Sequence, residues 1–230
     1  GDEAGLGEAG PPPILRAGFA ACLACLLAPA VLPAMPAAPE AGIEAASMVA
    51  AEAATGLWFG WLARMLALAL PMAAQWAAYL LGLSSVLNPD PKLGAQTTAL
   101  SRLFEMAAPV AVLSTGLYQL PLAALAGLYA VVPPGRWLPG ADGAEAAAEA
   151  AAASLALAAR LAAPFVLASV AFSLATGLLA RLAPRLQIYY AALPGQILGG
   201  FALLAALAGA MMAAWAQAAR GGFAALPGMG

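Results

Sequence analysis

The chain is organised around one polar segment, Asn88-Pro89-Asp90-Pro91-Lys92-Leu93-Gly94-Ala95-Gln96-Thr97-Thr98. The sequence on either side of it is apolar over lengths sufficient to cross a bilayer. The prolines fix φ and do not continue a helix, and Gly94 permits backbone conformations that a Cβ resists. We therefore predict that the chain turns here between two hydrophobic helices. Composition alone favours an ordinary solvated loop, because proline, glycine and polar residues collect in loops generally.

The composition indicates a chain that is surrounded by lipid or by other protein subunits. Of its 230 residues, 64% are hydrophobic and 9% are charged, whereas an ordinary soluble domain is about 25% charged. The net charge is −2, with no basic block, which disfavours a nucleic-acid partner. The chain has no histidine, so it lacks the commonest general base and the commonest metal ligand.

The residues carry no pattern typical of an enzyme or a cofactor site. There is no nucleophile–base pair, no glycine-rich phosphate loop and no cluster of metal ligands in the sequence. Cys22 and Cys25 form a C-x-x-C spacing inside an apolar run, without a second pair of ligands. We interpret both as small core residues. The sequence thus predicts no catalytic, cofactor-binding or metal site, and no enzymatic activity.

Apolar runs predict an all-α, polytopic membrane protein with about five long, proline-broken hydrophobic helices, the last two forming a C-terminal hairpin. The second run is the apolar part of a helix expected from about residue 45, and the alanine-rich residues 144–153 are expected to form a helical lead-in to the fourth. The five runs cover residues 14–33, 57–87, 103–132, 155–180 and 186–219.

Proline and glycine inside these runs favour a protein that packs against others around a passage. Proline removes a backbone hydrogen bond, and such breaks survive in membranes where neighbouring protein or a water-filled cavity satisfies the freed groups. Small residues, here Gly195, Gly199 and Gly200, allow helices to approach closely. The internal prolines are Pro29, Pro71, Pro109, Pro121, Pro164 and Pro194.

The basic residues predict an orientation. Lys92 and Arg102 mark the central segment, and Arg181 and Arg185 mark the turn before the last run. The linker 34–44 has only acids, and residues 133–153 have three acids to one base. By the positive-inside rule, the central segment and the last turn should face the cytoplasm, and the C-terminus should face outward.

Glu105 is the candidate coupling acid of a transporter, because it lies one turn into the third run. It follows Arg102 by three residues, a spacing that permits an ion pair on a helix. One hypothesis is therefore a small-molecule transporter that acts as a monomer or homodimer, but we favour it less than a structural role for Glu105. The interpretation that we prefer is that Arg102 and Glu105 anchor the start of the helix at the membrane interface.

Three stretches resemble one known family. The first is Leu6-Gly7-Glu8, followed by Pro13-Ile14-Leu15-Arg16-Ala17-Gly18. The second is Gly82-Leu83-Ser84, followed by Asp90-Pro91-Lys92-Leu93-Gly94-Ala95-Gln96 and Leu100-Ser101. The third is the most specific and comprises Gly177-Leu178-Leu179-Ala180-Arg181-Leu182-Ala183-Pro184-Arg185-Leu186-Gln187, then Leu193-Pro194 and Gly199. This pattern is similar to the FliR/SctT family of type III export-gate membrane proteins, and its Asp-Pro-x-x-Gly-x-Gln motif looks more flagellar than injectisomal.

The resemblance implies a one-copy structural subunit of a helical export gate in the bacterial inner membrane, as part of the flagellar basal body. Its partners would be FliP-type and FliQ-type subunits, FlhB, the lipid membrane and exported flagellar proteins in transit. Residues 1–143 would form a FliP-like part and residues 144–230 a FliQ-like hairpin. Residues 84–98 would plug the pore, shaped by Ser84, Asp90, Pro91, Gly94 and Gln96. Gly177, Arg181, Pro184, Arg185, Pro194 and Gly199 would shape the hairpin.

Two departures from the family pattern limit what carries over. The family has a further hydrophobic helix before its Gly-Glu motif, which is expected to be missing from this sequence. The family's Asn-Gly-His-His corresponds here to Thr115-Gly116-Leu117-Tyr118. Only the glycine is kept, so no role of those histidines is transferred.

Overall fold

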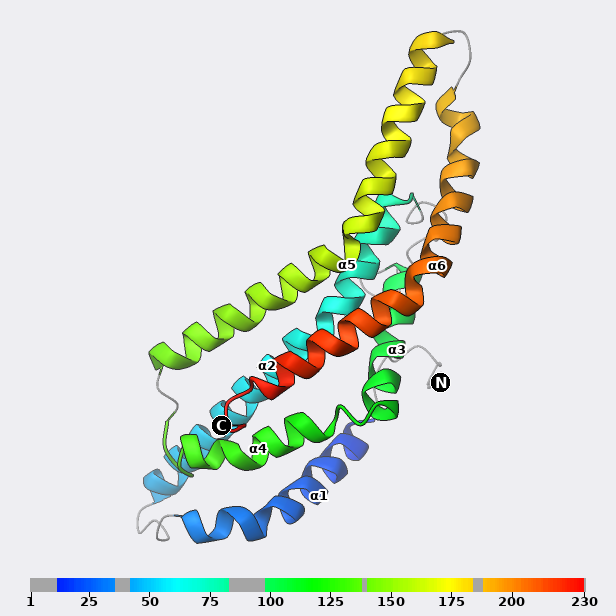
Figure 1. Ribbon diagram of the computed structural model, residues 1–230. Helices are drawn as coiled ribbons and strands as arrows, with labels where there is room; N and C mark the ends of the chain where they lie inside the picture. Colours follow the sequence, from blue (N-terminus) through cyan, green and yellow to red (C-terminus); the bar gives the residue numbers. More distant parts are fainter. Residues whose placement is uncertain (1–11, 36–41, 83–97, 138–139, 184–187, 230) are drawn as a thin grey trace, which may run out of the picture.

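A computed structural model describes residues 12–35, 42–82, 98–137, 140–183 and 188–229. All of the regular secondary structure in these ranges is helical, which confirms the predicted all-α class (Figure 1). The elements are α1 (Pro13–Val31), the 3-10 helix η1 (Leu32–Ala34), α2 (Gly42–Leu80), α3 (Ala99–Ser114), α4 (Gln119–Val131), α5 (Gly140–Leu182) and α6 (Ile188–Ala224).

The helices confirm a polytopic membrane protein. Three of those described are long and apolar enough to cross a membrane: α2, α5 and the part of α6 over Ala192–Ala224. The count rises to four if the bent pair α3 and α4 forms one broken span. The apolar part of α1, Pro13–Pro29, is shorter. The lead-in expected at residues 144–153 is continuous with the fourth apolar run, because both belong to α5.

The third apolar run is not one long helix, and it does not break at its prolines. Pro109 lies inside α3, whereas the chain bends by 75° between α3 and α4. Gly116 in this bend has φ of 71°, which glycine adopts without strain. The hydroxyl of Thr115 donates to the Ala111 carbonyl at 2.6 Å, so it satisfies a carbonyl at the helix end. The glycine shared with the family pattern is therefore the residue that the bend requires.

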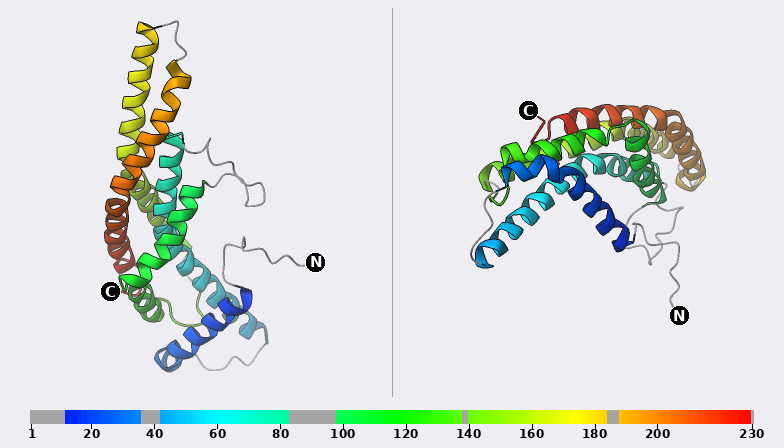
Figure 2. Two further views of the ribbon diagram at one scale, coloured as in Figure 1. Left: turned by 90° about the vertical axis from the view of Figure 1, so that its right-hand side faces the viewer. Right: turned by 90° about the horizontal axis from the view of Figure 1, so that it is seen from below.

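The other internal prolines are also accommodated within continuous helices. Pro29, Pro71, Pro164 and Pro194 lie inside α1, α2, α5 and α6. Figures 1 and 2 show that α5 and α6 are bent along their length and that their far halves run side by side beyond the other helices. Proline is a usual cause of such bends. These halves form the predicted C-terminal hairpin.

Helix α2 is the central element, because it contacts α3, α5 and α6. Its buried face is built largely from alanine, and Ala69, Ala73 and Ala77, four residues apart, are fully buried. Side chains this small let neighbouring backbones approach closely. The surrounding helices add large side chains to this core, including Phe165 of α5 and Trp215 of α6, both fully buried.

Side chains from the surrounding helices donate hydrogen bonds to backbone carbonyls of α2. Ser154 of α5 donates to Met65 at 2.6 Å. Trp215 donates through Nε1 to Leu66 at 3.3 Å. These bonds satisfy the Ser154 hydroxyl and the Trp215 indole N–H, each of which would cost free energy if it were buried without a partner.

Glu52 of α2 ties the opposite end of the helix to α4 and the segment after it. Its carboxylate accepts hydrogen bonds from the Tyr129 hydroxyl at 3.3 Å and from the Gly135 amide at 2.7 Å. Nearby, the indole of Trp58 donates to the Gly143 carbonyl at the start of α5 at 2.9 Å. Polar contacts thus fix this end of the bundle.

Close helix approach occurs at Gly200 rather than at its neighbours. A Cβ at Gly200 would lie 2.9 Å from the Cβ of Leu81, beside the end of α2. At Gly195 and Gly199, a Cβ would meet no described atom within 4 Å. Among the described residues, Gly195 and Gly199 therefore make no such close contact, and their predicted role in helix packing remains a prediction.

Cys22 and Cys25 are exposed on α1, so their interpretation as core residues is wrong within this chain. Helix α1 packs against α4, but large side chains such as Ile14, Phe19 and Leu26 remain exposed. The apolar composition of a helix therefore does not show that other parts of the same chain bury its side chains.

We predict that Ala73→Leu destabilises the fold. Ala73 is fully buried, and forcing extra methylene groups into packed cores costs about 1–3 kcal/mol. The matched control is Ala53→Leu, the same change at an exposed position of α2, which should change stability by less than about 0.5 kcal/mol. Thermal unfolding in detergent measures both, and equal melting temperatures for the two variants would contradict the packing described for α2.

Candidate functional site

The predicted plug residues Ser84, Asp90, Pro91, Gly94 and Gln96 lie outside the described residues. The structure does describe the chain on both sides of this segment, up to Gly82 and from Thr98 onward. The candidate site is therefore built from the groups that hold these two ends.

The first end is held by α6. Gln196 donates through Nε2 to the carbonyl of Leu80 at 3.3 Å. Leu80 is the last residue of α2, where carbonyls lack partners within the helix. Gly82 then leaves the helix with φ of 70°, a conformation that favours glycine.

The second end is held by α2. The backbone amide and the hydroxyl of Thr98 donate to Oε1 of Gln75 at 2.9 and 3.0 Å. The same hydroxyl oxygen accepts from the Ser101 amide at 3.2 Å, which caps α3. Ser101 in turn donates through Oγ to the Pro71 carbonyl at 3.0 Å. Thr98 and Ser101 are buried, so these bonds are sheltered from competing water.

We call Gln75, Thr98, Ser101 and Gln196 the segment frame. Gln75, Thr98 and Ser101 attach the start of α3 to the last third of α2, and Gln196 attaches the end of α2 to α6. The sequence prediction missed Gln75 and Gln196. The available signal was that each is an amide in an otherwise uncharged apolar stretch, where a polar side chain must find a partner.

Arg102 and Glu105 lie on the first two turns of α3, directly after the frame. Arg102 is half-buried and Glu105 is exposed. Neither forms an ion pair with the other or with another residue in the described ranges. Their predicted role as helix anchors therefore remains a prediction.

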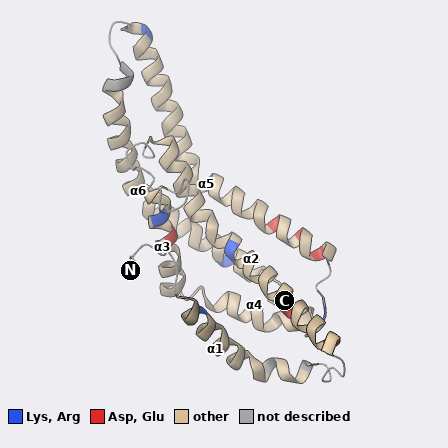
Figure 3. Cartoon of the chain, turned by 180° about the vertical axis from the view of Figure 1, so that it is seen from behind, with Lys and Arg blue, Asp and Glu red and all other residues tan. Residues whose placement is uncertain are grey.

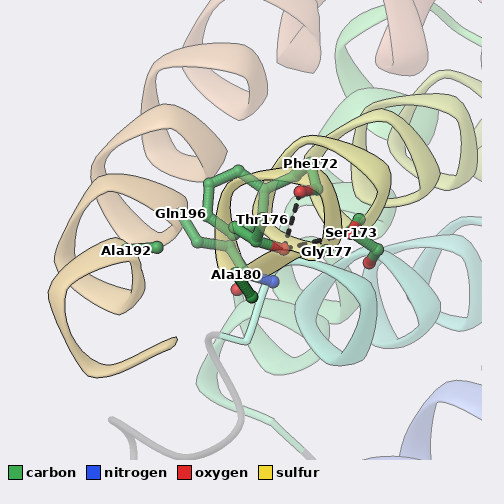
Figure 4. A pocket seen from close by; sticks show the side chains of 7 residues that line it. All are labelled: Phe172, Ser173, Thr176, Gly177, Ala180, Ala192 and Gln196. Carbon is green, nitrogen blue, oxygen red and sulfur yellow. Dashed lines mark hydrogen bonds between the residues drawn. The ribbon is translucent and has the colours of Figure 1, made fainter. Parts of the chain in front are cut away.

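Two of the predicted hairpin residues, Gly177 and Gly199, border cavities beside α5 and α6. Gly177 of α5 borders a cavity of about 310 Å³ between α5 and α6 (Figure 4). Gly199 borders a second one of about 270 Å³. Pro194 is exposed inside α6, and Arg181 is exposed in the last turn of α5. Pro184 and Arg185 lie outside the described residues.

The polar side chains in Figure 4 are largely satisfied by their own helix. The Thr176 hydroxyl contacts the carbonyls of Phe172 at 2.9 Å and Ser173 at 3.1 Å, and the Ser173 hydroxyl donates to the Ser169 carbonyl at 2.8 Å. Among the described residues, no group of three or more His, Cys, Asp or Glu side chains could hold a metal ion. The arrangement suits helix packing and segment positioning.

We predict that Gln75→Met loosens the start of α3. The substitution removes the acceptor of two Thr98 hydrogen bonds. A net loss of about 1–2 kcal/mol corresponds to amide hydrogen exchange at Thr98 that is roughly 5- to 30-fold faster. Gln217→Met, on an exposed part of α6, is the control and should leave this exchange unchanged. An unaltered exchange rate in Gln75→Met would show that Gln75 does not hold this end.

Comparison with known proteins gives two matches. The family model described as bacterial export proteins, family 1, matches residues 4–221. The flagellar biosynthetic protein FliR of Caulobacter vibrioides is 30% identical over 201 residues, which cover 87% of this chain and 80% of that protein. The matched region contains every described helix up to the last turn of α6. The chain therefore belongs to bacterial export protein family 1, the FliR/SctT family that its motifs predicted.

Proposed function

We propose that this chain is a structural subunit of the flagellar type III protein export gate, where it forms a gated pore with FliP-type and FliQ-type subunits. Unfolded flagellar proteins would cross the inner membrane through this pore, and FlhB would join the same assembly. Membership of the export family and similarity to a flagellar biosynthetic protein support a role as a component of the flagellar export apparatus. That role is structural and needs no bond chemistry.

The observation that carries the proposal is the apolar surface that the chain leaves uncovered. On α5, Leu167, Val170, Leu174 and Leu178 are exposed by 72%, 52%, 64% and 63%. They lie on the second half of α5 (Gly140–Leu182), which forms one arm of the hairpin (Figure 1). Apolar patches of this extent mark surfaces that contact lipid or other subunits. Subunits of a helical gate would cover such a surface.

A second apolar seam supports assembly on the other side of the molecule. Leu103, Met106, Val110 and Leu113 are exposed on α3 at spacings of three and four residues. This spacing aligns side chains along one helix face, as at helix–helix contacts. The seam begins directly after the segment frame, so a neighbouring helix here would lie close to the central segment.

The segment frame supports a plug role for residues 84–98. A plug must be held firmly at its ends while its middle blocks the passage. Gln75 and Gln196 provide such attachment. The residues that would shape the plug are Ser84, Asp90, Pro91, Gly94 and Gln96, and Arg102 and Glu105 would anchor the helix that follows.

The proposed division into residues 1–143 and 144–230 falls within the first turns of α5. Since α5 also packs extensively on α2, the two parts would share one hydrophobic core. The FliQ-like part would then be the hairpin of α5 and α6, with Gly177, Arg181, Pro184, Arg185, Pro194 and Gly199 at its arms and turn.

The distribution of charge supports the proposed orientation in the inner membrane. Figure 3 shows acidic residues gathered on the first part of α5 and a basic residue at the hairpin tip. The acids there are Asp142, Glu145 and Glu149, and Arg181 lies in the last turn of α5. The positive-inside rule then places the tip on the cytoplasmic side.

Native mass spectrometry tests the assembly. The chain would be co-expressed with FliP-type and FliQ-type subunits from the same genome and extracted in mild detergent. We expect one copy of this chain with several copies of each partner. A monomer or homodimer free of these partners would overturn the proposal and favour a transporter instead.

Gly94→Val tests the plug. A β-branched residue restricts the backbone conformations available to Gly94, so we expect reduced secretion of flagellar proteins, measured in the culture medium. Gly140→Val serves as control, because Gly140 is exposed at the start of α5 and a Cβ there meets no described atom within 4 Å. Normal secretion by the Gly94 variant would count against a plug at this position.

A further inference from the structure

The chain leaves α6 through a tight turn that packs onto α4. Beyond the end of α6, residues 226–229 form a β-turn in which the Met229 amide donates to the Leu226 carbonyl at 3.2 Å. Pro227 and Gly228 occupy its two central positions, and Gly228 has φ of 98°. Proline followed by a glycine of positive φ is the pattern of a type II turn. We call residues 226–229 the α6 turn.

The contact between the α6 turn and α4 requires glycine on both sides. A Cβ added to Gly228 would collide with the carbonyl oxygen of Ala124 and would lie 2.7 Å from the carbonyl carbon of Gly127. In the opposite direction, a Cβ added to Gly127 would collide with the carbonyl oxygen of Gly228. All of these atoms belong to the backbone, which does not move aside as a flexible side chain does. The turn and the helix therefore meet backbone to backbone.

Apolar side chains around this contact are buried. Phe223 in the last turn of α6 and Leu226 in the α6 turn pack into the same hydrophobic core as Ala124 and Leu128 of α4. Figure 1 shows the end of α6 beside α4, and the two helices are in contact. Burial of apolar surface stabilises this arrangement. The α6 turn is thus part of the core.

Helix α4 needs support from another element because the chain bends just before it. Helices α3 and α4 meet at 75°, and Gly116 in this bend has a positive φ. Glycine permits more backbone conformations than other residues, so the bend restricts the angle only weakly. At its other end α4 is tied to α2 by the hydrogen bond from Tyr129 to Glu52. The α6 turn holds α4 between these two points, at Ala124 and Gly127.

We propose that the α6 turn is a latch that fixes α4 on α6 and so sets the angle between α3 and α4. Because α3 begins at the segment frame, the latch joins one arm of the hairpin to the helix pair that follows the central segment. The family match ends at residue 221, so the latch lies beyond the matched region. The proposal concerns the packing of this chain and does not depend on the proposed export function.

A distance measurement between α3 and α4 tests the latch. The full chain in detergent would carry spin labels through Leu103→Cys and Ala130→Cys, at exposed positions of α3 and α4. The exposed Cys22 and Cys25 would be replaced by alanine. Gly127→Ala should at least double the width of the distance distribution measured by double electron–electron resonance, because the added Cβ displaces the α6 turn. An unchanged distribution would overturn the proposal.

The Gly127 substitution separates the contact from helix stability. Alanine favours a helix more than glycine does, so by itself the change would stabilise α4. Gly221→Ala is the matched control, because Gly221 is exposed on α6 and a Cβ there meets no described atom within 4 Å. The control should keep the distance distribution of the parent chain. Broadening of the same size in both variants would contradict a latch at Gly127.

Hydrogen exchange in the unsubstituted chain covers the case in which a variant does not fold. The amides of Leu226 and Met229 donate hydrogen bonds at 3.3 and 3.2 Å. A turn docked on α4 should protect them, whereas a free turn opens readily. We expect both amides to exchange at least tenfold more slowly than in an isolated peptide of residues 221–230 in the same detergent. Equal exchange rates in the chain and the peptide would overturn the proposal independently of any substitution.

Discussion

The fold depends on the backbone carbonyls of α2 as hydrogen-bond acceptors for the helices around it. In a chain that is 64% hydrophobic, few polar groups are available, and each buried donor needs a partner where water is scarce. Ser154, Ser101, Trp215 and Gln196, which come from α5, α3 and α6, each donate to a carbonyl of α2. These directional bonds specify where each helix crosses α2, whereas apolar packing alone is tolerant of sliding.

The alanine face of α2 makes these bonds geometrically accessible. A Ser hydroxyl is short, so it reaches a neighbouring backbone only when the two helices approach closely. Fully buried alanines at Ala69, Ala73 and Ala77 permit that approach. Small side chains and backbone acceptors therefore act together. The alanines let the helices approach closely, and the hydrogen bonds to the α2 carbonyls fix their register. The segment frame shows the same kind of contact, because Ser101 and Gln196 donate hydrogen bonds to the carbonyls of Pro71 and Leu80.

Sequence reasoning predicted the helices well, because hydrophobic length is a local property. It expected proline to break the third apolar run, whereas the chain bends between α3 and α4, where Gly116 has a positive φ. The sequence did not predict the hydrogen bonds of the segment frame for a different reason. Gln75 meets Thr98 across 23 positions and Gln196 meets Leu80 across 116, and no periodicity connects residues so far apart. Likewise, an apolar setting suggested that Cys22 and Cys25 were buried, although burial depends on what packs against α1.

The segment frame also limits how a plug could operate. Gln75 and Leu80, the two attachment points on α2, are five residues apart, or about 8 Å along a helix. Both ends of the central segment therefore start from nearly the same place on one rigid element. Opening by separating α2 from α3 would break the bonds of Thr98 and Ser101 and expose the alanine face. On the proposed function, a plug motion that leaves Gln75, Thr98 and Ser101 in place keeps these contacts between α2 and α3.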